Sequence, residues 1–544
     1  CLVALAACSG SSEGPAVAKG TGSAAVVTFQ ATDKAGSWFD CSGTPSCITY
    51  GGEKSLAIVH PGATIAFSST GQAETLHTAV SLIWPTGAHK MPFDVDLIPP
   101  VLGGDQKPFT VNLVEKGLYV FYCDIHPYMF AAVIVDDPST TTTDAAGKKV
   151  PAYDLGETID VAVPGNTIPT SSDLATRLLR TFFIATDPTN WKDYRPGTSV
   201  NGDITYPSVP VVITGGGVAN LDTVLSTRYG NHQPKITATH SLFTPTTEAV
   251  GEVWVDTQFE LTSGKTKPGT VTAVEGQTWK TTRKVALNLN NPHNLWTNED
   301  QSLIYQTEWF DNYLTVFNRT TGVQTARTLV GPAPAHVMTR TNNGDVHVSL
   351  NGANDVVELL PGGAVIRRNI PMSLTPGEST HPHAHWMSAD GSMMVTPNPD
   401  TEDSTVYHFD LDASLDKIVG RTAVGHFPIA TGMMPNSSKY YVANFLDSTI
   451  SVIGIAGFPL APAPTFLYNI NLLAKYDPIG GCTTPPNPNF DCSFVGGLPI
   501  QTPVSPDGKV MMTANTLTAT LTLVDTATDK VIKMLGCEPG CHGV

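Results

Sequence analysis

Residues 117–129 read GLYVFYCDIHPYM, and this stretch decides how the first part of the chain folds. Aromatic and β-branched residues fill its beginning, which is typical of a buried strand. The residues that follow include Cys123, His126 and Met129, spaced three apart. We therefore expect a strand that ends at Cys123 and a tight loop that carries all three side chains.

A further histidine, His77, lies in the stretch ETLHTAV (residues 74–80) and would arrive from a different strand. In a sandwich, separate strands bring distant residues to one end. One thiolate, two imidazoles and a weakly held thioether are the ligands of a blue-copper centre, which exchanges single electrons with little rearrangement. His89 and Met91, in a predicted loop, are spare candidates. The predicted type 1 copper ligands are His77, Cys123, His126 and Met129.

This pattern resembles the cupredoxin family over roughly residues 24 to 137. The resemblance rests on the C-x2-H-x2-M spacing, the upstream His-Thr pair and the apolar run at residues 133–135. It implies a Greek-key sandwich with one mononuclear copper, because a dinuclear site would need a second cysteine in the loop. The plainer alternative is a buried structural thiol beside an unrelated histidine and a core methionine.

Length, net charge and composition describe the chain as a whole. A chain of 544 residues is too long for one sandwich and should hold at least two domains. The formal net charge of −17 argues against binding to nucleic acid or anionic lipid, and a basic redox partner would suit it better. Few charged residues, with 48 glycines and 42 prolines, are typical of a turn-rich, all-β protein.

The first residues are set apart from the fold. Residues 2–10, LVALAACSG, read as the end of an apolar signal and resemble a bacterial lipobox, in which Cys8 would carry the lipid. We therefore expect residues 1–23 to be a signal remnant and lead. The protein would be an exported periplasmic or cell-surface lipoprotein of a prokaryote, reaching the membrane only through its lipid. A chance run of small residues is the alternative.

Most other cysteines fall in close pairs, which fits disulfides in an oxidising compartment, although sequence alone does not prove the pairing. The tail GCEPGCH (residues 536–542) also resembles a c-type haem attachment site with one extra residue between the cysteines. Haem at Cys537, Cys541 and His542 is the less favoured interpretation. The expected disulfides are Cys41–Cys47, Cys482–Cys492 and Cys537–Cys541.

The second half of the chain is repetitive. Residues 138–164 read as a linker, and from about residue 240 the sequence repeats. The clearest copy, KYYVANFLDSTISVI at residues 439–453, resembles the YVTN-type β-propeller blade. About six copies are readable, and the stretch before residue 240 is either a further blade or a lead-in. We predict a seven-bladed propeller over residues 165–544, with its last blade truncated.

Histidines recur at one position of these repeats, eight residues before the turn that precedes the second strand. The subtractions 301 − 8, 344 − 8 and 391 − 8 give His293, His336 and His383. This position opens the innermost strand near the central channel, where imidazoles of different blades converge. Such a ring favours copper or zinc. The predicted propeller ligands are His240, His293, His336, His383, His385 and His542.

Two blades break the series, with Ile429 and Ile500 in the histidine position. His385 belongs to the cluster HPHAH, together with His381. The alternative role for these histidines is structural: each would bond a neighbouring backbone carbonyl and help close its blade.

A histidine-ringed propeller with a cupredoxin is similar to nitrous oxide reductase, in which the cupredoxin feeds electrons to a copper cluster. Here the cupredoxin comes first and carries one copper, and two blades lack the histidine. Neither that reaction nor a four-copper cluster therefore carries over. A nearer resemblance is to the exported cupredoxin-propeller proteins often called copper oxidases.

The sequence thus favours an exported copper-dependent oxidoreductase. Its type 1 copper would exchange electrons with a second, histidine-ligated metal, expected to be copper, on the propeller axis, and the substrate would be small. Its catalytic residues, its substrate and the direction of electron flow stay open. The alternative is an envelope blue-copper carrier or copper-binding protein whose propeller only docks a partner protein. A passive surface-layer or adhesion protein leaves the copper ligands unexplained.

Overall fold

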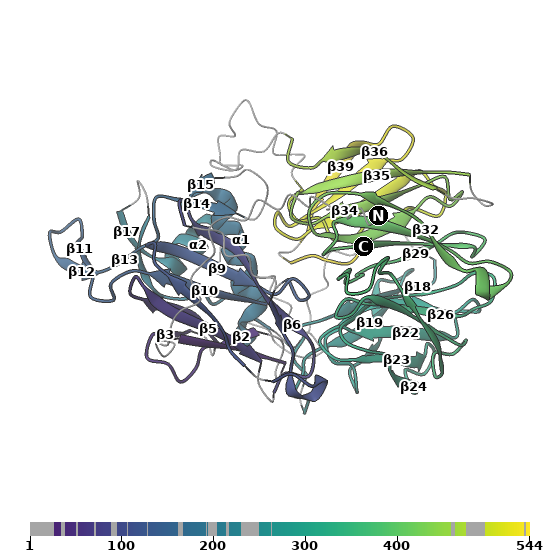
Figure 1. Cartoon of the computed structure of the whole chain (residues 1–544), viewed down its shortest axis with the longest axis horizontal. Coiled ribbons are helices and arrows are strands. Elements are labelled where there is room, and N and C mark those ends of the chain that lie inside the picture. Colours follow the sequence, from purple (N-terminus) through teal and green to yellow (C-terminus); the bar gives the residue numbers. More distant parts are fainter. Residues whose placement is uncertain are drawn as a thin grey trace, which may run out of the picture.

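The computed structural model describes residues 27–33, 38–50, 53–69, 72–88, 95–105, 107–127, 129–161, 167–191, 193, 204–213, 217–229, 250–262, 264–457, 463–474, 496–537 and 540–544. Strands dominate these residues, and they form two bodies that lie side by side (Figure 1). The first body is built from the N-terminal part of the chain, and the second is a ring of sheets that begins at residue 250.

The N-terminal body is a β-sandwich. Its first sheet has the order β2-β1-β5-β8, with β1 (Val27–Thr32), β2 (Trp38–Asp40), β5 (Ala63–Ser69) and β8 (Phe109–Leu113). Its second sheet has the order β15-β14-β6-β9-β10-β4-β3, and β7 pairs with β6. These strands are β3 (Cys47–Tyr50), β4 (Glu53–Val59), β6 (His77–Pro85), β7 (Val95–Leu97), β9 (Gly117–Tyr122), β10 (Phe130–Val135), β14 (Thr158–Val161) and β15 (Thr167–Pro169).

The two sheets meet through apolar side chains that alternate along their strands. Phe67 on β5 packs against Phe121 on β9 with ring centroids 5.1 Å apart, and against Phe29 on β1 at 5.5 Å. Strand β9 contains the aromatic run of the sequence and ends one residue before Cys123. The fold therefore delivers Cys123 to one end of the sandwich.

The described residues between 138 and 229 add to this body, whereas we expected a linker at 138–164 and a propeller from residue 165. The hairpin of β11 (Thr141–Thr143) and β12 (Lys149–Pro151) is followed by a small sheet of β13 (Tyr153–Asp154), β16 (Pro210–Ile213) and β17 (Gly217–Asn220). Helix α1 (Asp173–Thr186) starts at Ser172, whose side chain accepts a hydrogen bond from the Ala175 N–H. Its Phe182 and Phe183 pack on Phe130 of β10.

The remaining helical elements are short. They are α2 (Leu221–Tyr229) and the 3-10 turns η1 (Pro100–Leu102), η2 (Pro188–Asn190) and η3 (Ala413–Leu415). The longest described helix is α1, with 14 residues, and no helix in the described part of the chain has the length and apolarity needed to span a bilayer.

From residue 250 onward the chain folds as a β-propeller of antiparallel sheets. The first three blades hold β18 (Glu252–Thr257), β19 (Thr270–Glu275), β20 (Lys280–Val285); β21 (Pro292–Thr297), β22 (Leu303–Glu308), β23 (Tyr313–Asn318), β24 (Gln324–Leu329); and β25 (Pro334–Thr339), β26 (Val346–Leu350), β27 (Asp355–Leu359), β28 (Ile366–Pro371). The next three hold β29 (Trp386–Met387), β30 (Met393–Asn398), β31 (Asp403–His408), β32 (Lys417–Ala423); β33 (Pro428–Met433), β34 (Lys439–Asn444), β35 (Thr449–Ala456), β36 (Ala463–Asn471); and β37 (Val510–Asn515), β38 (Thr520–Asp525), β39 (Lys530–Gly536).

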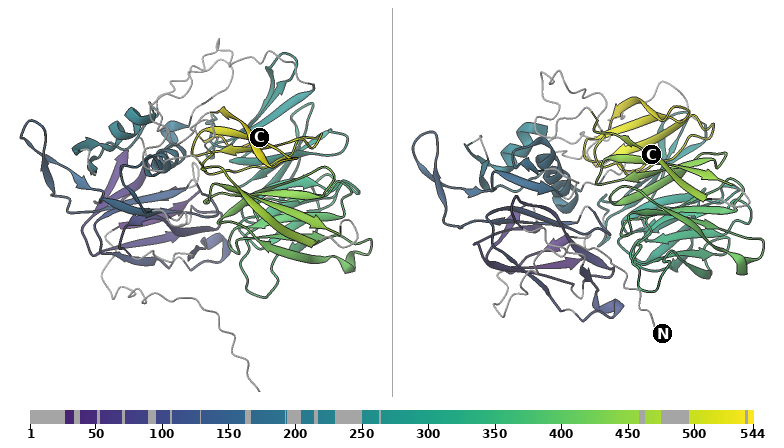
Figure 2. Two further views of the ribbon diagram at one scale, coloured as in Figure 1. Left: turned by 90° about the horizontal axis from the view of Figure 1, so that it is seen from above. Right: turned by 45° about the horizontal axis from the view of Figure 1, so that its top comes forward.

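The first strands of successive blades contact one another, from β18 to β21, β25, β29 and β33, so they surround a common axis. Figure 2 shows the last strands (yellow) beside the first blade (teal), where the ring closes. The described residues supply six blades, and the seventh blade that we predicted is not among them. In the last blade the inner strand is reduced to two isolated bridges, Pro499 with Asn515 and Val504 with Met511.

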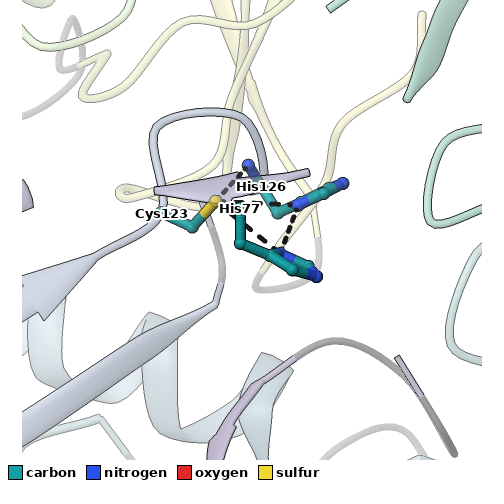
Figure 3. Close-up of side chains that lie close together, drawn as sticks. All are labelled: His77, Cys123 and His126. Atoms are coloured by element: carbon teal, nitrogen blue, oxygen red, sulfur yellow. Dashed lines mark hydrogen bonds between the residues drawn. The ribbon is translucent and has the colours of Figure 1, made fainter. Parts of the chain in front are cut away.

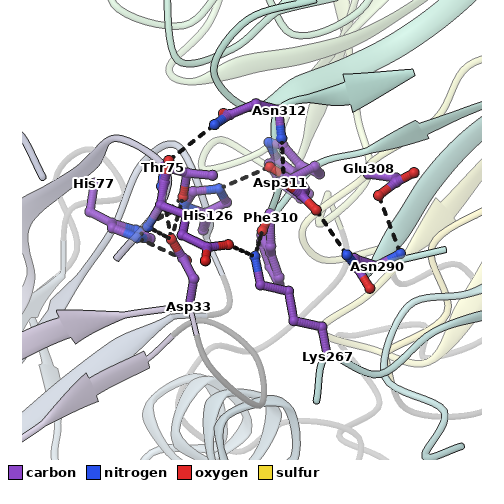
Figure 4. A network of polar contacts seen from close by, with 12 residues as sticks. Asp33, Thr75, His77, His126, Lys267, Asn290, Glu308, Phe310, Asp311 and Asn312 are labelled. Atoms are coloured by element: carbon purple, nitrogen blue, oxygen red, sulfur yellow. Dashed lines mark hydrogen bonds and ion pairs between the residues drawn. The ribbon is translucent and has the colours of Figure 1, made fainter. Parts of the chain in front are cut away.

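The two bodies are joined by the turn between β22 and β23, residues 309–312. Lys267 pairs with Glu74 of the sandwich at 2.7 Å and donates to the carbonyl of Phe310 at 3.0 Å. The side-chain amide of Asn312 donates to the carbonyl of Glu74 at 3.1 Å (Figure 4). Trp309 and Phe310 share one apolar cluster with Cys123 of the sandwich. The interface is thus a packed core bordered by polar contacts.

Replacing Lys267 by methionine should lower the melting temperature. The change keeps the buried stem but leaves the Phe310 carbonyl without this donor, a loss of about 1.5–3 kcal/mol for a hydrogen bond to a charged group. Thermal unfolding followed by circular dichroism tests this. Lys509→Met, which removes an exposed pair with Asp507, is the control and should leave the melting temperature unchanged. Equal melting temperatures of the two variants would show that Lys267 does not stabilise the interface.

Candidate metal centres

The first cluster lies at the end of the sandwich that faces the propeller. His77 opens β6 and Cys123 follows β9, and pairing of these strands places them side by side. The Cys123 Sγ lies 4.0 Å from His77 Nδ1 and 3.6 Å from His126 Nδ1, and the two Nδ1 atoms are 3.1 Å apart (Figure 3). All three side chains are fully buried. One sulfur and two nitrogens therefore face a common point.

Backbone hydrogen bonds shape the loop that carries these ligands. The Cys123 N–H donates to the carbonyl of Met129 at 3.0 Å, and the Met129 N–H donates to the carbonyl of His126 at 2.8 Å. The N–H groups of Thr78 and His126 donate to the Cys123 Sγ at 3.3 and 3.4 Å. Such donors stabilise a negatively charged sulfur. Met129 is also fully buried, in the same apolar cluster as Cys123.

Asp33, which sequence reasoning missed, orients His77. Its Oδ1 lies 3.0 Å from His77 Nε2, and its Oδ2 accepts hydrogen bonds from the N–H groups of Glu74 and Thr75. Burial acts to raise the pKa of Asp33, but its attraction to His77 outweighs this and holds the pKa well below its usual range. Burial lowers the pKa of His77, and Asp33 more than offsets it, raising it to about 10. With Nε2 bonded to Asp33, Nδ1 is the atom that faces Cys123 and His126, and a metal ion bound there would displace its proton.

His126 presents its two nitrogens to different bodies. Its Nδ1 faces Cys123, and its Nε2–H donates to the carbonyl of Trp309 at 3.4 Å. Burial, followed by the nearby His77, keeps the pKa of His126 well below its usual range. A neutral imidazole is the form that binds metals. Two imidazoles and a cysteine sulfur, dry and already oriented, could hold a borderline-soft ion such as copper.

The second cluster lies on the propeller axis, where the register of histidines predicted it. Ring centroids of His293 are 5.7 Å from His336, 5.1 Å from His383 and 4.9 Å from His542. His336 and His383 are 5.2 Å apart. One nitrogen each of His293, His336 and His383 lies within 4.8 Å of the others, and all three residues are buried. This spacing would let the three imidazoles share one ion.

The two blades that lack the histidine contact the imidazole rings that come from the other blades. The Nδ1–H of His383 donates to the carbonyl of Ile429 at 2.7 Å. The side-chain amide of Gln501, next to Ile500, lies 3.3 Å from His336 Nε2. Among the described residues, Nε2 of His293 and of His383 has no hydrogen-bond partner. Buried polar atoms normally have one, so these two nitrogens are suited to a ligand.

Burial sets the charge of this cluster. It keeps the pKa of His293 and His336 well below the usual range, helped by the neighbouring histidines. It lowers the pKa of His383 to about 3 and that of His542 to about 4. The imidazoles are therefore neutral at physiological pH, as metal ligation requires.

The other predicted residues lie elsewhere. His385 is buried outside the three-histidine group, and neither of its ring nitrogens has a partner in the described part of the chain. His381 lies 3.4 Å from Asp400. Disulfides join Cys41 to Cys47 and Cys537 to Cys541, and the latter bond uses the two thiols that haem attachment would need. Outside the described residues lie Cys8, His89, Met91, His240, Cys482 and Cys492.

A cavity of about 630 Å³ opens beside the second cluster. His293, His542, Asp256 and Gln501 line it, together with the edge strand β18. It is large enough to admit a small molecule to the face of His293.

Trp309 lies between the two clusters. Its ring centroid is 5.4 Å from that of His126, 4.1 Å from His293 and 5.0 Å from His383. Sequence reasoning missed Trp309. The signal available for it was an apolar pair, Trp309 and Phe310, between the acidic residues Glu308 and Asp311. Only the docking of the two bodies shows that the Trp309 ring lies between the two histidine sets.

No protein-family model and no curated protein sequence matches this chain. Solved structures are similar to about half of this chain. They include the periplasmic gluconolactonase PpgL of Pseudomonas aeruginosa (13% identity, TM-score 0.41, 54% of this chain and 84% of that one), the Cps50 (Swd1) β-propeller domain of Myceliophthora thermophila (10%, 0.39, 50% and 81%) and a protein from Lactobacillus plantarum (16%, 0.40, 50% and 80%). Identities this low bear on the fold alone, and the propeller is established by its strand order.

Asp33→Asn should weaken copper binding at the first cluster. The amide cannot supply the charge that orients and polarises His77, and losing such an outer partner typically costs about 10- to 100-fold in metal affinity. Competition titration with a copper chelator measures the change. Asp40→Asn, which alters a carboxylate bonded to Ser42, is the matched control. Identical affinities for the two variants would show that Asp33 does not support the site.

Asp256→Asn should change how stability depends on pH. Burial raises the pKa of Asp256 to about 7, and its carboxylate accepts a hydrogen bond from Gln306. Between about pH 4 and pH 7 the folded chain therefore holds a proton that the unfolded chain releases, so rising pH lowers stability. The variant should melt higher than the parent at pH 8 and show no gain at pH 4. A constant difference at both pH values would refute this.

Proposed function

We propose that this chain is an exported copper-dependent oxidoreductase in which two metal centres exchange electrons. The first would be a mononuclear type 1 copper held by His77, Cys123, His126 and Met129. The second would be held by His293, His336 and His383, with copper the expected ion. The observation that carries the proposal is that both buried histidine sets pack against one side chain, Trp309.

The first set supports the proposal through its chemistry. A copper ion bound by one thiolate and two imidazoles supplies reversible one-electron exchange. The residues around it keep water out, hold His77 through Asp33 and donate two N–H groups to the Cys123 sulfur. The cupredoxin-like spacing of these ligands in the sequence agrees with this role.

The second set supports a reaction site rather than a simple platform. A docking surface has no need of three buried, neutral imidazoles whose nitrogens approach one another. The cavity beside His293 would admit a small substrate, and its walls offer the polar groups of Asp256 and Gln501. Copper, unlike zinc, would let this site exchange electrons with the first.

The proposed location of the protein rests on its sequence. A lipid at Cys8 would hold it in the periplasm or at the cell surface of a prokaryote, and paired cysteines suit that oxidising compartment. Its net charge of −17 suits a basic partner protein that delivers or removes electrons.

Metal content, measured together with the visible spectrum, tests the proposal. The copper-loaded protein should contain more than one metal per chain and show one intense blue band. Cys123→Ser should abolish the band and keep the propeller metal. The triple variant His293→Ala, His336→Ala, His383→Ala should lose the propeller metal and keep the band.

His60→Ala removes an exposed histidine and serves as the control, with metal content and colour expected to stay unchanged. If the triple variant binds as much metal as the parent, the second centre does not exist. The chain would then be a blue-copper carrier, and its propeller histidines would serve only to close their blades.

A further inference from the structure

We propose that the indole of Trp309 is the link through which the two ligand sets exchange electrons. This inference rests on the proposed function and assigns a role within it to one side chain. Trp309 is not a ligand of either set. Its role would be to fill the space between them with a conjugated ring.

The contacts with the sandwich come first. The Trp309 ring lies 5.4 Å from that of His126, centroid to centroid, and its own carbonyl accepts the Nε2–H of the same histidine at 3.4 Å. His126 uses its other nitrogen to face Cys123. The path from Cys123 through His126 to Trp309 therefore consists of groups in direct contact.

The contacts with the propeller are closer. The indole centroid is 4.1 Å from His293 and 5.0 Å from His383. These are the two histidines whose Nε2 atoms have no partner among the described residues. One side chain thus touches a ligand of the first set and two ligands of the second.

The indole is retained at an energetic cost. Trp309 is fully buried, and its Nε1–H has no hydrogen-bond partner in the part of the chain that the structure describes. Such a group destabilises the fold, and phenylalanine would fill much of the same space without it. A residue kept for packing alone would not need this N–H, which favours a role for the larger ring.

The turn that carries Trp309 is held firmly on the propeller side. Arg327 bonds both Glu308 and Asp311, which flank the Trp309–Phe310 pair, at 3.0 and 3.1 Å. Asn290 donates a further hydrogen bond to Asp311 at 2.9 Å. On the sandwich side, Lys267 and Asn312 contact Glu74 (Figure 4). The ring position is therefore fixed from both bodies.

The electron balance is simple. With an ion held by each set, one electron would leave the reduced ion and reduce the oxidised one. The indole of Trp309 would couple the two sets by orbital overlap and would itself be unchanged, so no proton or further reactant is required.

Kinetics on the copper-loaded protein test the role. A fast one-electron pulse reduces the first site and bleaches the blue band, and the band recovers as the electron passes to the propeller metal. Trp309→Leu keeps the backbone carbonyl but removes the ring, and the recovery should slow severalfold because a gap replaces packed atoms along the path. Trp309→Phe should give an intermediate rate.

Phe310→Leu is the matched control. In the described part of the chain the Phe310 ring contacts His126, Phe259 and Trp309 but none of the propeller histidines. This variant disturbs the same interface and should recover at nearly the parental rate. Metal content and the position of the blue band should be equal in all variants. If Trp309 had only a structural role, the variants with slow recovery would also lose metal or shift the band.

The outcomes separate the two proposals. If the parent binds both metals but its blue band never recovers, the proposed function fails. If the parent recovers and Trp309→Leu recovers equally fast, the function stands and the role of Trp309 is overturned. If the leucine variant does not fold, Trp309→Phe decides: a rate equal to that of the parent overturns the role, and a slower one supports it.

Discussion

The arrangement of both candidate metal centres depends on the docking of one turn, residues 309–312, onto the end of the sandwich. Trp309 and Phe310 bury their rings against the cluster that contains Cys123, and Lys267 bonds Glu74 at the margin. Burial of such large rings is the strongest single contribution available to an interface of this kind. Without it, His126 would face solvent and the two ligand sets would be separate.

Burial has a second consequence, which is chemical. It keeps the pKa of His126 and of the propeller histidines low, so they stay neutral and ready to bind an ion. In the dry interior the structure bonds one nitrogen of each ring to a specific acceptor, Asp33 for His77 and the Ile429 carbonyl for His383, which leaves the other nitrogen for a ligand. The same environment that prepares the ligands thus fixes their orientation.

The sequence was informative wherever a short spacing carried the signal. The strand before Cys123, the loop to Met129 and the register of His293, His336 and His383 could all be predicted, because periodicity and ligand spacing are local properties. The α1 region could not. Its helix packs on Phe130 of the sandwich, and nothing in the local sequence names the surface that its apolar side chains cover.

The sequence by itself determined the mainly β character, the propeller and the identity of the candidate metal ligands. Only the tertiary structure decided that Asp33 supports His77, that six blades are formed by the described residues, and that Trp309 lies between the two histidine sets. The physical reason is distance along the chain. Residues 33, 77 and 126 meet only when the strands of the sandwich pair, and residues 126, 309 and 383 meet only when the two bodies pack together. No local pattern encodes either arrangement.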